Sequence, residues 1–218
     1  MQVGADNDWA HVVAGSGRSF AIKADGTLWA WGSNSNYALG LGDQDARTEP
    51  TKVNDDTDWV AVDSQGNNGS TFALKADGTL WAWGWNGYGQ LGLGTYDTVI
   101  DTPGLVDSDG EWVAVSADHS YAMGVKADGT LWGWGSNTGG QLGLGSGQSI
   151  VFWAPTRLLT GEWSVEHWHA ISAGSSYSHA IALDGTLWAW GDNGYAMLGD
   201  GTTDRRRTPV QIGDAADW

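Results

Sequence analysis

Aromatic side chains that depart from the regular pattern of this sequence are its first candidates for recognition chemistry. Trp85 stands where three related segments of the chain carry serine or aspartate, and Phe152 and Trp153 lie in a long connection between two such segments. Large apolar rings in loops are better candidates for partner contacts than rings inside strands. We therefore predict Trp85, Phe152 and Trp153 as binding residues.

Three consecutive arginines, Arg205, Arg206 and Arg207, form a second candidate. They stand out because the chain has 26 Asp and Glu against 10 Lys and Arg, and a net charge of −16. Guanidinium groups bind carboxylates through paired hydrogen bonds. The triplet is therefore predicted to dock on a carboxylate-rich surface, including the acidic surface of a second copy. The alternative is a solvated loop that balances Asp200 and Asp204.

Metal ligands and catalytic groups form no recognisable pattern. His167 and His169 could present two imidazoles on one strand face, but no third zinc ligand accompanies them. The acidic turns at 54–58, 107–111 and 200–204 lack the spacing of a calcium loop and are typical of hairpins. Motifs of serine hydrolases, zinc proteases and nucleotide-binding loops are absent. We predict no catalytic residue, no metal and no cofactor, although an acid pair for glycoside hydrolysis among the carboxylates stays open.

The charge and the apolar pattern exclude several partner classes. An acidic surface repels phosphate backbones and anionic lipids, which argues against nucleic-acid and membrane binding. No apolar stretch approaches the length of a membrane span, and no secretion signal follows Met1. The absence of cysteine fits both a cytosolic protein and an exported one. The compartment stays open, with an extracellular, cell-surface or virion location slightly favoured.

The candidate residues lie in four copies of one repeat. The segment Lys-Ala-Asp-Gly-Thr-Leu-Trp-Ala-Trp-Gly at 23–32 returns in similar form at 75–84, 126–135 and 183–191. We divide the chain into repeats at 9–58, 59–111, 112–167 and 168–217, with half-repeat overlaps at both ends. Recurrence at equivalent positions indicates that all but Trp85, Trp153 and Trp163 of the 16 tryptophans pack between repeats.

Each repeat predicts short antiparallel strands. The Asp-Gly pair between alternating apolar runs predicts a hairpin turn whose two central residues both have positive φ. In the first repeat we expect strands over 19–23 and 27–31, with Leu28 on one face and Trp29 and Trp31 on the other. No segment has a sustained helical period. The predicted fold is therefore an all-β propeller of four blades, each a four-stranded antiparallel sheet.

Three motifs carry a resemblance to a known family. They are Trp-Val-Ala-Val, Ala-Leu-Lys-x-Asp-Gly-x-Leu-Trp-x-Trp-Gly-x-Asn and Gln-Leu-Gly-Leu-Gly, as at 59–62, 73–86 and 90–94. The repeat resembles the RCC1 repeat (regulator of chromosome condensation), especially its bacterial and phage versions, over nearly the whole chain. The resemblance implies a propeller, usually of seven blades, that binds partners on its flat faces or by loops between blades. It also implies that His119 and His179 are packed, structural histidines.

Four blades are fewer than the ring that this family usually forms. We expect a segment of a longer array, half of an eight-bladed ring that a second copy completes, or a self-closed four-bladed ring. The overlap between residues 2–9 and 211–218 leads to the first two arrangements. Unclosed blades would expose sheet edges and apolar faces, which favours association.

The leading functional prediction is a non-enzymatic protein-interaction or scaffold propeller. Its partner is another protein or another copy of itself, in a homodimer that completes a propeller. The nucleotide exchange and chromatin binding of some eukaryotic family members are not expected, because the GTPase insertion loop is not recognisable and the charge is negative. The alternatives are a self-assembling component of a ring, filament, virion or cell surface, and a carbohydrate-binding module that uses Trp85, Trp153 or loop tyrosines such as Tyr37, Tyr88 and Tyr195.

Overall fold

The computed structural model describes residues 6–64, 68–107, 109–145, 150–158 and 167–216, and these form four separate four-stranded antiparallel sheets. The first two sheets contain β1 (Trp9–Gly15), β2 (Arg18–Lys23), β3 (Leu28–Gly32) and β4 (Arg47–Lys52), then β5 (Trp59–Asp63), β6 (Thr71–Lys75), β7 (Leu80–Trp85) and β8 (Val99–Asp107). The last two contain β9 (Trp112–Ala117), β10 (Tyr121–Lys126), β11 (Leu131–Ser136) and β12 (Val151–Arg157), then β13 (Trp168–Gly174), β14 (Tyr177–Ala182), β15 (Leu187–Gly191) and β16 (Arg206–Gln211). One short 3₁₀ turn, η1 (Ser35–Tyr37), is the helical element of the described part. The prediction of four four-stranded blades is confirmed; Trp163 and Trp218 lie outside the described residues.

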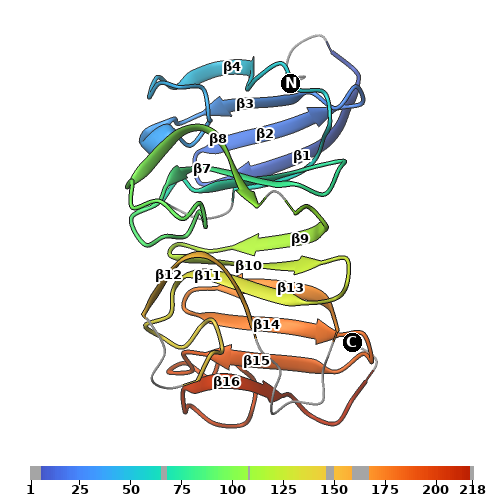
Figure 1. The fold of residues 1–218 in the computed structure, drawn as a ribbon, viewed down its shortest axis with the longest axis vertical. Helices are drawn as coiled ribbons and strands as arrows, with labels where there is room; N and C mark the ends of the chain where they lie inside the picture. The colour runs from blue at the N-terminus through green and yellow to red at the C-terminus, as the bar shows by residue number, and fades with distance from the viewer. Residues whose placement is uncertain (1–5, 65–67, 108, 146–149, 159–166, 217–218) are drawn as a thin grey trace.

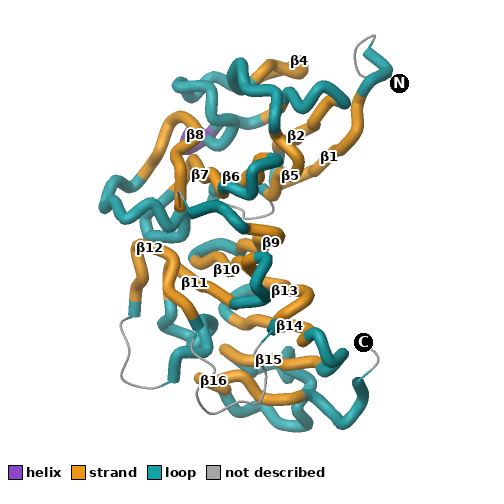
Figure 2. Tube along the Cα trace, turned by 45° about the vertical axis from the view of Figure 1, so that its right-hand side comes forward, coloured by secondary structure: helices purple, strands orange, loops and turns teal. Residues whose placement is uncertain are grey.

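The four sheets follow one another along an open arc (Figure 1). The first sheet lies at one end of the arc and the fourth at the other, and these two sheets are far apart in both views (Figures 1 and 2). The expectation of a self-closed four-bladed ring is therefore wrong for this structure. The first and fourth sheets are therefore not neighbours in this arc (Figure 1).

The Asp-Gly hairpins form as predicted, but with a different turn. Gly26 has a φ of 78°, whereas Asp25 is not among the residues with positive φ. The Gly26 N–H donates to the Lys23 carbonyl, and the Lys23 N–H donates to Thr27. This pattern is a three-residue loop in which a turn with ordinary φ values is followed by one left-handed glycine. The expectation of two positive φ values was wrong because the Asp25 carboxylate accepts hydrogen bonds from the Thr27 N–H and hydroxyl, which holds the aspartate in the turn.

Tryptophans of each sheet pack onto the apolar face of the sheet before it. Trp59 and Trp83 of the second sheet join Phe20, Leu28 and Leu39 in one buried cluster. Leu28 and Ala30 of β3 are fully buried on this face, as the alternation predicts. The core of the protein is thus a series of inter-sheet layers.

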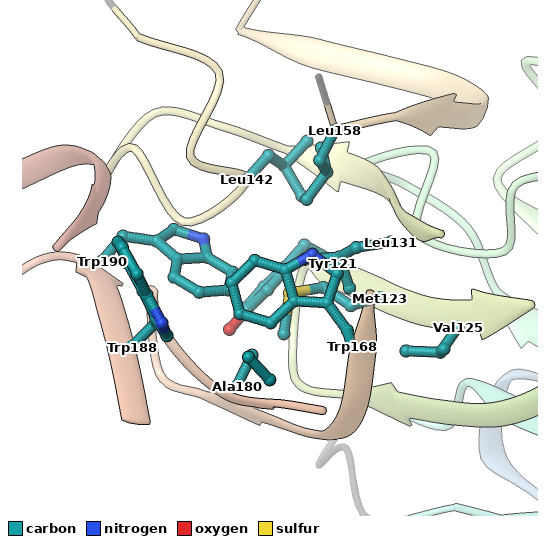
Figure 3. Close-up of a cluster of buried hydrophobic side chains, with 11 residues drawn as sticks. Tyr121, Met123, Val125, Leu131, Leu142, Leu158, Trp168, Ala180, Trp188 and Trp190 are labelled. Carbon is teal, nitrogen blue, oxygen red and sulfur yellow. The ribbon is translucent and has the colours of Figure 1, made fainter. Parts of the chain in front are cut away.

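Figure 3 shows the equivalent layer between the third and fourth sheets, where Trp168 and Trp190 lie against Tyr121, Met123 and Leu142. The buried tryptophans of the second to fourth sheets confirm the predicted packing role, whereas Trp9 and Trp31 of the first sheet are half-buried and no described sheet covers them.

Candidate protein-binding surface

The predicted binding residues lie on or beside the outer strands of three successive sheets. Trp85 ends β7 and pairs with Val99 at the start of β8. Phe152 and Trp153 are in β12, and Arg206 and Arg207 are in β16, directly after Arg205. The outer edge of the arc therefore carries all six residues.

These outer strands occupy equivalent positions in their sheets. The glycine after the second tryptophan of the repeat pairs with Ile100 in β8, with Phe152 in β12 and with Arg206 in β16. In each outer strand, the residue that follows this partner accepts a hydrogen bond at its carbonyl from a glycine N–H of the preceding sheet. The N–H groups of Gly42, Gly94 and Gly145 donate to the carbonyls of Asp101, Trp153 and Arg207 at 3.0, 2.8 and 2.8 Å. We call the surface formed by Trp85, Tyr88, Tyr96, Trp153 and Arg205–Arg207 the outer rim.

The aromatic half of the outer rim centres on Trp153. Its ring lies 4.7 Å from the ring of Tyr96, whose residue is 76% exposed. The Trp153 ring also approaches Gly89, where an added Cβ would lie 3.0 Å from the ring. Such an aromatic pair has large apolar faces and little side-chain entropy to lose on binding, which suits it to hold a partner.

Trp85 and Phe152 are less free than Trp153. The Trp85 ring folds over Gly87, and its indole nitrogen is buried without a hydrogen-bond partner. Phe152 packs against the buried clusters on both sides of the third sheet. Its ring therefore contributes to the core more than to the surface, although the prediction that it contacts a partner stays a prediction.

The arginine half of the outer rim is partly occupied by local carboxylates. Arg206 Nε lies 2.6 Å from Asp200 Oδ2, and Arg205 pairs with Asp192 at 3.3 Å. Arg207 is exposed and has no paired carboxylate among the described residues. Arg207 is thus the guanidinium most available to a partner, while Arg206 balances Asp200 as the alternative interpretation held.

The Asp200–Arg206 pair predicts a loss of stability in acid. Burial by itself would raise the pKa of Asp200, but hydrogen bonds from Thr202 and Arg206 lower the pKa to about 2, from 3.8. Because the pKa is lower in the folded state, the charged carboxylate stabilises the fold above pH 3.8, and this contribution fades as the pH falls toward 2. We expect Arg206→Gln to lower the melting temperature at neutral pH by a difference that shrinks steadily below pH 4.

Thermal unfolding of both proteins across this pH range measures the effect. Arg207→Gln is the matched control, because Arg207 has no such pair, and its melting curve should follow the wild type at every pH. A melting-temperature difference for Arg206→Gln that stays constant down to pH 2 would contradict the assignment.

Aspartates of the acidic turns at 54–58 and 107–111 form ion pairs with lysines. Lys75 pairs with Asp56 and Asp58 at 2.9 and 3.1 Å, and its ammonium lies 4.9 Å from the ring centroids of Trp59 and Trp81. Lys23 and Lys126 occupy equivalent sites between two tryptophans and next to aspartates, whereas the fourth sheet has Ala182 there. The sequence analysis missed this role, which the recurrence of the lysine before Asp-Gly could have indicated.

The histidines are dispersed over the molecule. His119 Nε2 lies 2.9 Å from the Asn68 amide nitrogen, and His179 is half-buried, with burial lowering its pKa. His167 and His169 are both exposed. Among the residues described, no group of three His, Cys, Asp or Glu side chains is arranged to hold a metal ion. Nor does the described part contain a helix long and apolar enough to cross a membrane.

Tyr96 is the residue of the outer rim that the sequence analysis did not select. It follows the Gly-Leu segment at 90–94, where a large aromatic in an exposed turn was a usable signal. Tyr88, selected only for the carbohydrate alternative, is also exposed and lies 6.3 Å from the His119 ring. Tyr37 lies in η1 between β3 and β4, and Tyr195 lies between β15 and β16, so these two tyrosines belong to the first and the fourth repeats.

Two models of one known repeat family match the chain. A family model described as the regulator of chromosome condensation (RCC1) repeat matches residues 25–71, 77–125, 128–182 and 184–217. A second model of that description matches 9–38 and 61–90. Together they cover most of the chain.

Curated relatives share this repeat within longer proteins. The chain is 32% identical to the probable E3 ubiquitin-protein ligase HERC6 of Homo sapiens over 92% of its own length, which is 20% of the relative. It is 28% identical to the ultraviolet-B receptor UVR8 of Arabidopsis thaliana over 92% of its length, or 45% of the relative. The chain thus spans less than half of either protein. These relatives give no support to the bacterial or phage subtype.

Solved structures show the same fold. Human WBSCR16 superposes with a TM-score of 0.83 at 22% identity, over 98% of this chain and 55% of that one. Prp20p from Saccharomyces cerevisiae superposes with a TM-score of 0.82 at 20% identity, over 98% of this chain and 53% of that one. The arc described above therefore corresponds to about half of each of these structures.

Proposed function

Because the chain belongs to the RCC1 repeat family, we propose that it is a protein-binding propeller without catalytic chemistry of its own, and that the outer rim holds the partner. The observation that carries this proposal is the pair of the exposed Tyr96 and the half-buried Trp153, which lies on the same edge as Arg207. An aromatic platform on one outer strand and an unpaired guanidinium on the outer strand of the next sheet suit an extended segment that combines an apolar side chain with carboxylates.

Relatives and neighbours support the binding role. Prp20p is described with its binding to Gsp1p and histones, and a second structure has Kap60 bound to the yeast protein. HERC6 and HERC2 are named as ubiquitin ligases, but the chain matches only 20% of human HERC6 and 4% of human HERC2. We infer that the present chain corresponds to a binding portion of such proteins and that it transfers no ubiquitin.

The net charge of −16 further suggests a protein rather than a nucleic acid as the partner. It also disfavours strongly acidic partners everywhere except at the arginines. The proposed partner segment therefore has few carboxylates, placed to meet Arg207, and an apolar or aromatic residue to meet Trp153.

Selection of displayed random peptides against the wild-type chain tests this proposal. Peptides retained by the wild type should bind the double variant Tyr96→Ala/Trp153→Ala at least tenfold more weakly, as expected for a central aromatic contact, and Arg207→Glu should weaken the acidic ones. Isothermal titration gives the affinities, and circular dichroism confirms that the variants fold. The matched control is Tyr195→Ala, an exposed tyrosine at the end of the arc, which should leave binding unchanged.

Equal binding of the selected peptides to the wild type and the double variant would refute the outer rim as the site. Binding in a glycan array that the double variant loses, without any retained peptide, would refute protein binding and favour the carbohydrate alternative.

A further inference from the structure

One hydrogen bond recurs at every junction between neighbouring sheets. The indole N–H of Trp83 donates to the Ala38 carbonyl at 2.9 Å, that of Trp134 to Gln90 at 2.7 Å and that of Trp190 to Gln141 at 2.7 Å. Each bond joins the third strand of one sheet to the loop of the sheet before it. The three junctions therefore share a donor, an acceptor and a direction.

A hydroxyl reinforces two of the junctions. Thr71 donates to the same Ala38 carbonyl at 2.9 Å, and Ser178 donates to Gln141 at 2.7 Å. In the first sheet, Ser19 occupies the equivalent position, because it pairs with Trp31 as Thr71 pairs with Trp83. The first sheet thus carries the same two donors, Ser19 and Trp31.

The first sheet presents its donors on a surface that no described segment of the chain covers. We call this surface the front face and define it by Trp9, Ser19 and Trp31. These residues are half-buried, whereas the equivalent Trp59 and Trp83 are 1% and 0% exposed. No acceptor for the Trp31 indole lies within the described part of the chain. The front face therefore has the chemistry of a junction without the preceding sheet.

The fourth sheet presents the complementary surface, which we call the back face and define by His179, Ile181, Leu187 and Met197. His179, Ile181 and Leu187 are half-buried. Their equivalents in the first sheet, which are Phe20, Ile22 and Leu28, are 0%, 3% and 0% exposed.

The back face also carries the acceptor of the junction. Met197 occupies the position of Ala38, Gln90 and Gln141, one residue before the buried leucine of the loop. By its place in the loop, its carbonyl is equivalent to the three that accept a tryptophan N–H, and within one chain the His179 side chain bonds to the Met197 backbone. The front face therefore supplies hydrogen-bond donors and tryptophan rings, and the back face supplies the matching acceptor and apolar side chains.

We propose that the front face of one chain docks on the back face of a second copy, repeating the internal junction. A second copy is the occupant because the chain itself contains three examples of this interface, each with two tryptophans on one side and an aromatic residue and leucines at equivalent positions on the other. The arc corresponds to 55% and 53% of two solved propeller chains, so two arcs complete about one ring. Both junctions of the pair form at once, which strengthens each of them.

This site is separate from the outer rim, so its test is independent of the proposed function. Light scattering on a size-exclusion column should give twice the 23.1 kDa mass of one chain. Trp31→Ala removes the front face and Ile181→Asp the back face, and each variant alone should run as a monomer. Both residues are half-buried, and circular dichroism verifies that the variants keep their strands.

Mixing the two variants gives the decisive result. The back face of Trp31→Ala and the front face of Ile181→Asp are both intact, so an equimolar mixture should recover dimer with one junction. A symmetric contact through any single patch would not recover in this way. The control variant Trp153→Ala on the outer rim should remain dimeric.

A crosslink tests the same contact without removing either face. The chain has no cysteine, so the double variant Ser19→Cys/Met197→Cys can be joined by a short bismaleimide only where these two positions meet. We expect a covalent dimer. Its yield should not fall when unlabelled Trp31→Ala/Ile181→Asp chains, which lack both faces, are mixed in. A wild type that is monomeric at every concentration, a mixture that stays monomeric, or the absence of a crosslinked dimer would each overturn the proposal.

Discussion

Replacement of Gly84 by alanine is expected to destabilise the protein by ~3 kcal/mol or more, since it combines backbone strain with a collision. Gly84 follows the tryptophan pair in β7 and has a φ of 94°, which side chains rarely adopt. An added Cβ would lie 1.9 Å from the Gly69 carbonyl oxygen, a backbone atom that cannot rotate away. Urea denaturation followed by tryptophan fluorescence measures the loss.

Gly94→Ala is the matched control for this prediction. Gly94 also has positive φ, at 69°, but nothing lies within 4 Å of the Cβ that alanine would add. The control should lose only the left-handed strain of about 1–2 kcal/mol. If Gly84→Ala cost no more than Gly94→Ala, the close approach of Gly69 would carry no energetic weight.

The glycine of the Trp-x-Trp-Gly motif illustrates what a sequence repeat can predict. Its recurrence at Gly32, Gly84, Gly135 and Gly191 marked a fixed feature of every blade, and all four have φ between 89° and 103°. The strands, their alternation and the four sheets followed from the same repetition. Each is a local property that neighbouring residues decide, and the hydrophobic pattern reports it directly.

The turn of the Asp-Gly hairpin shows where local inference failed. A two-residue turn and a three-residue turn with one left-handed glycine use the same Asp-Gly pair. The choice depended on the threonine two residues after the aspartate, whose N–H and hydroxyl both bond to the carboxylate in all four hairpins. The Asp-Gly-Thr triplet was therefore the better signal.

The outer rim could be predicted only in part. Trp153 and the arginines were visible as departures from the repeat, because an irregular residue in a regular pattern needs its own explanation. The contact of Tyr96 with Trp153 was not visible, since it joins a loop of the second sheet to a strand of the third. Such contacts depend on how blades stack, and no spacing within one repeat reports this.

The stacking also decides whether the arc closes, which sequence reasoning left as three alternatives. Every junction contains the same tryptophan-to-carbonyl hydrogen bond, and two of the three add a hydroxyl, so local chemistry does not distinguish closed from open arrangements. The open arc (Figure 1) excludes the self-closed four-bladed ring and leaves the segment of a longer array and the half-ring as alternatives, because closure depends on how each blade is placed against the next. The half-exposed front and back faces follow from that placement.

The second large effect is expected from Trp134→Ala, which should destabilise the protein by about 3–5 kcal/mol, the usual range for removing a buried tryptophan. Trp134 is 0% exposed, and its ring lies 6.2 Å from Phe72 of the preceding sheet and 5.7 Å from Trp112. Its indole N–H donates to Gln90 at 2.7 Å. Alanine would leave both a cavity at the junction and an unpaired buried carbonyl, and each of them costs free energy.

Two further variants separate these contributions. Trp134→Phe keeps most of the ring but removes the donor, so it should cost about 1–3 kcal/mol, the penalty of an unsatisfied buried acceptor together with a small cavity. Trp85→Ala, at a half-buried tryptophan whose indole nitrogen has no partner, removes the same side chain without breaking a junction bond and should cost clearly less than Trp134→Ala. Guanidinium denaturation of all three variants gives the comparison. Equal losses for Trp134→Ala and Trp85→Ala would mean that the junction hydrogen bond and the buried layer do not hold neighbouring blades together, and the docking of a second copy through the same groups would lose its energetic basis.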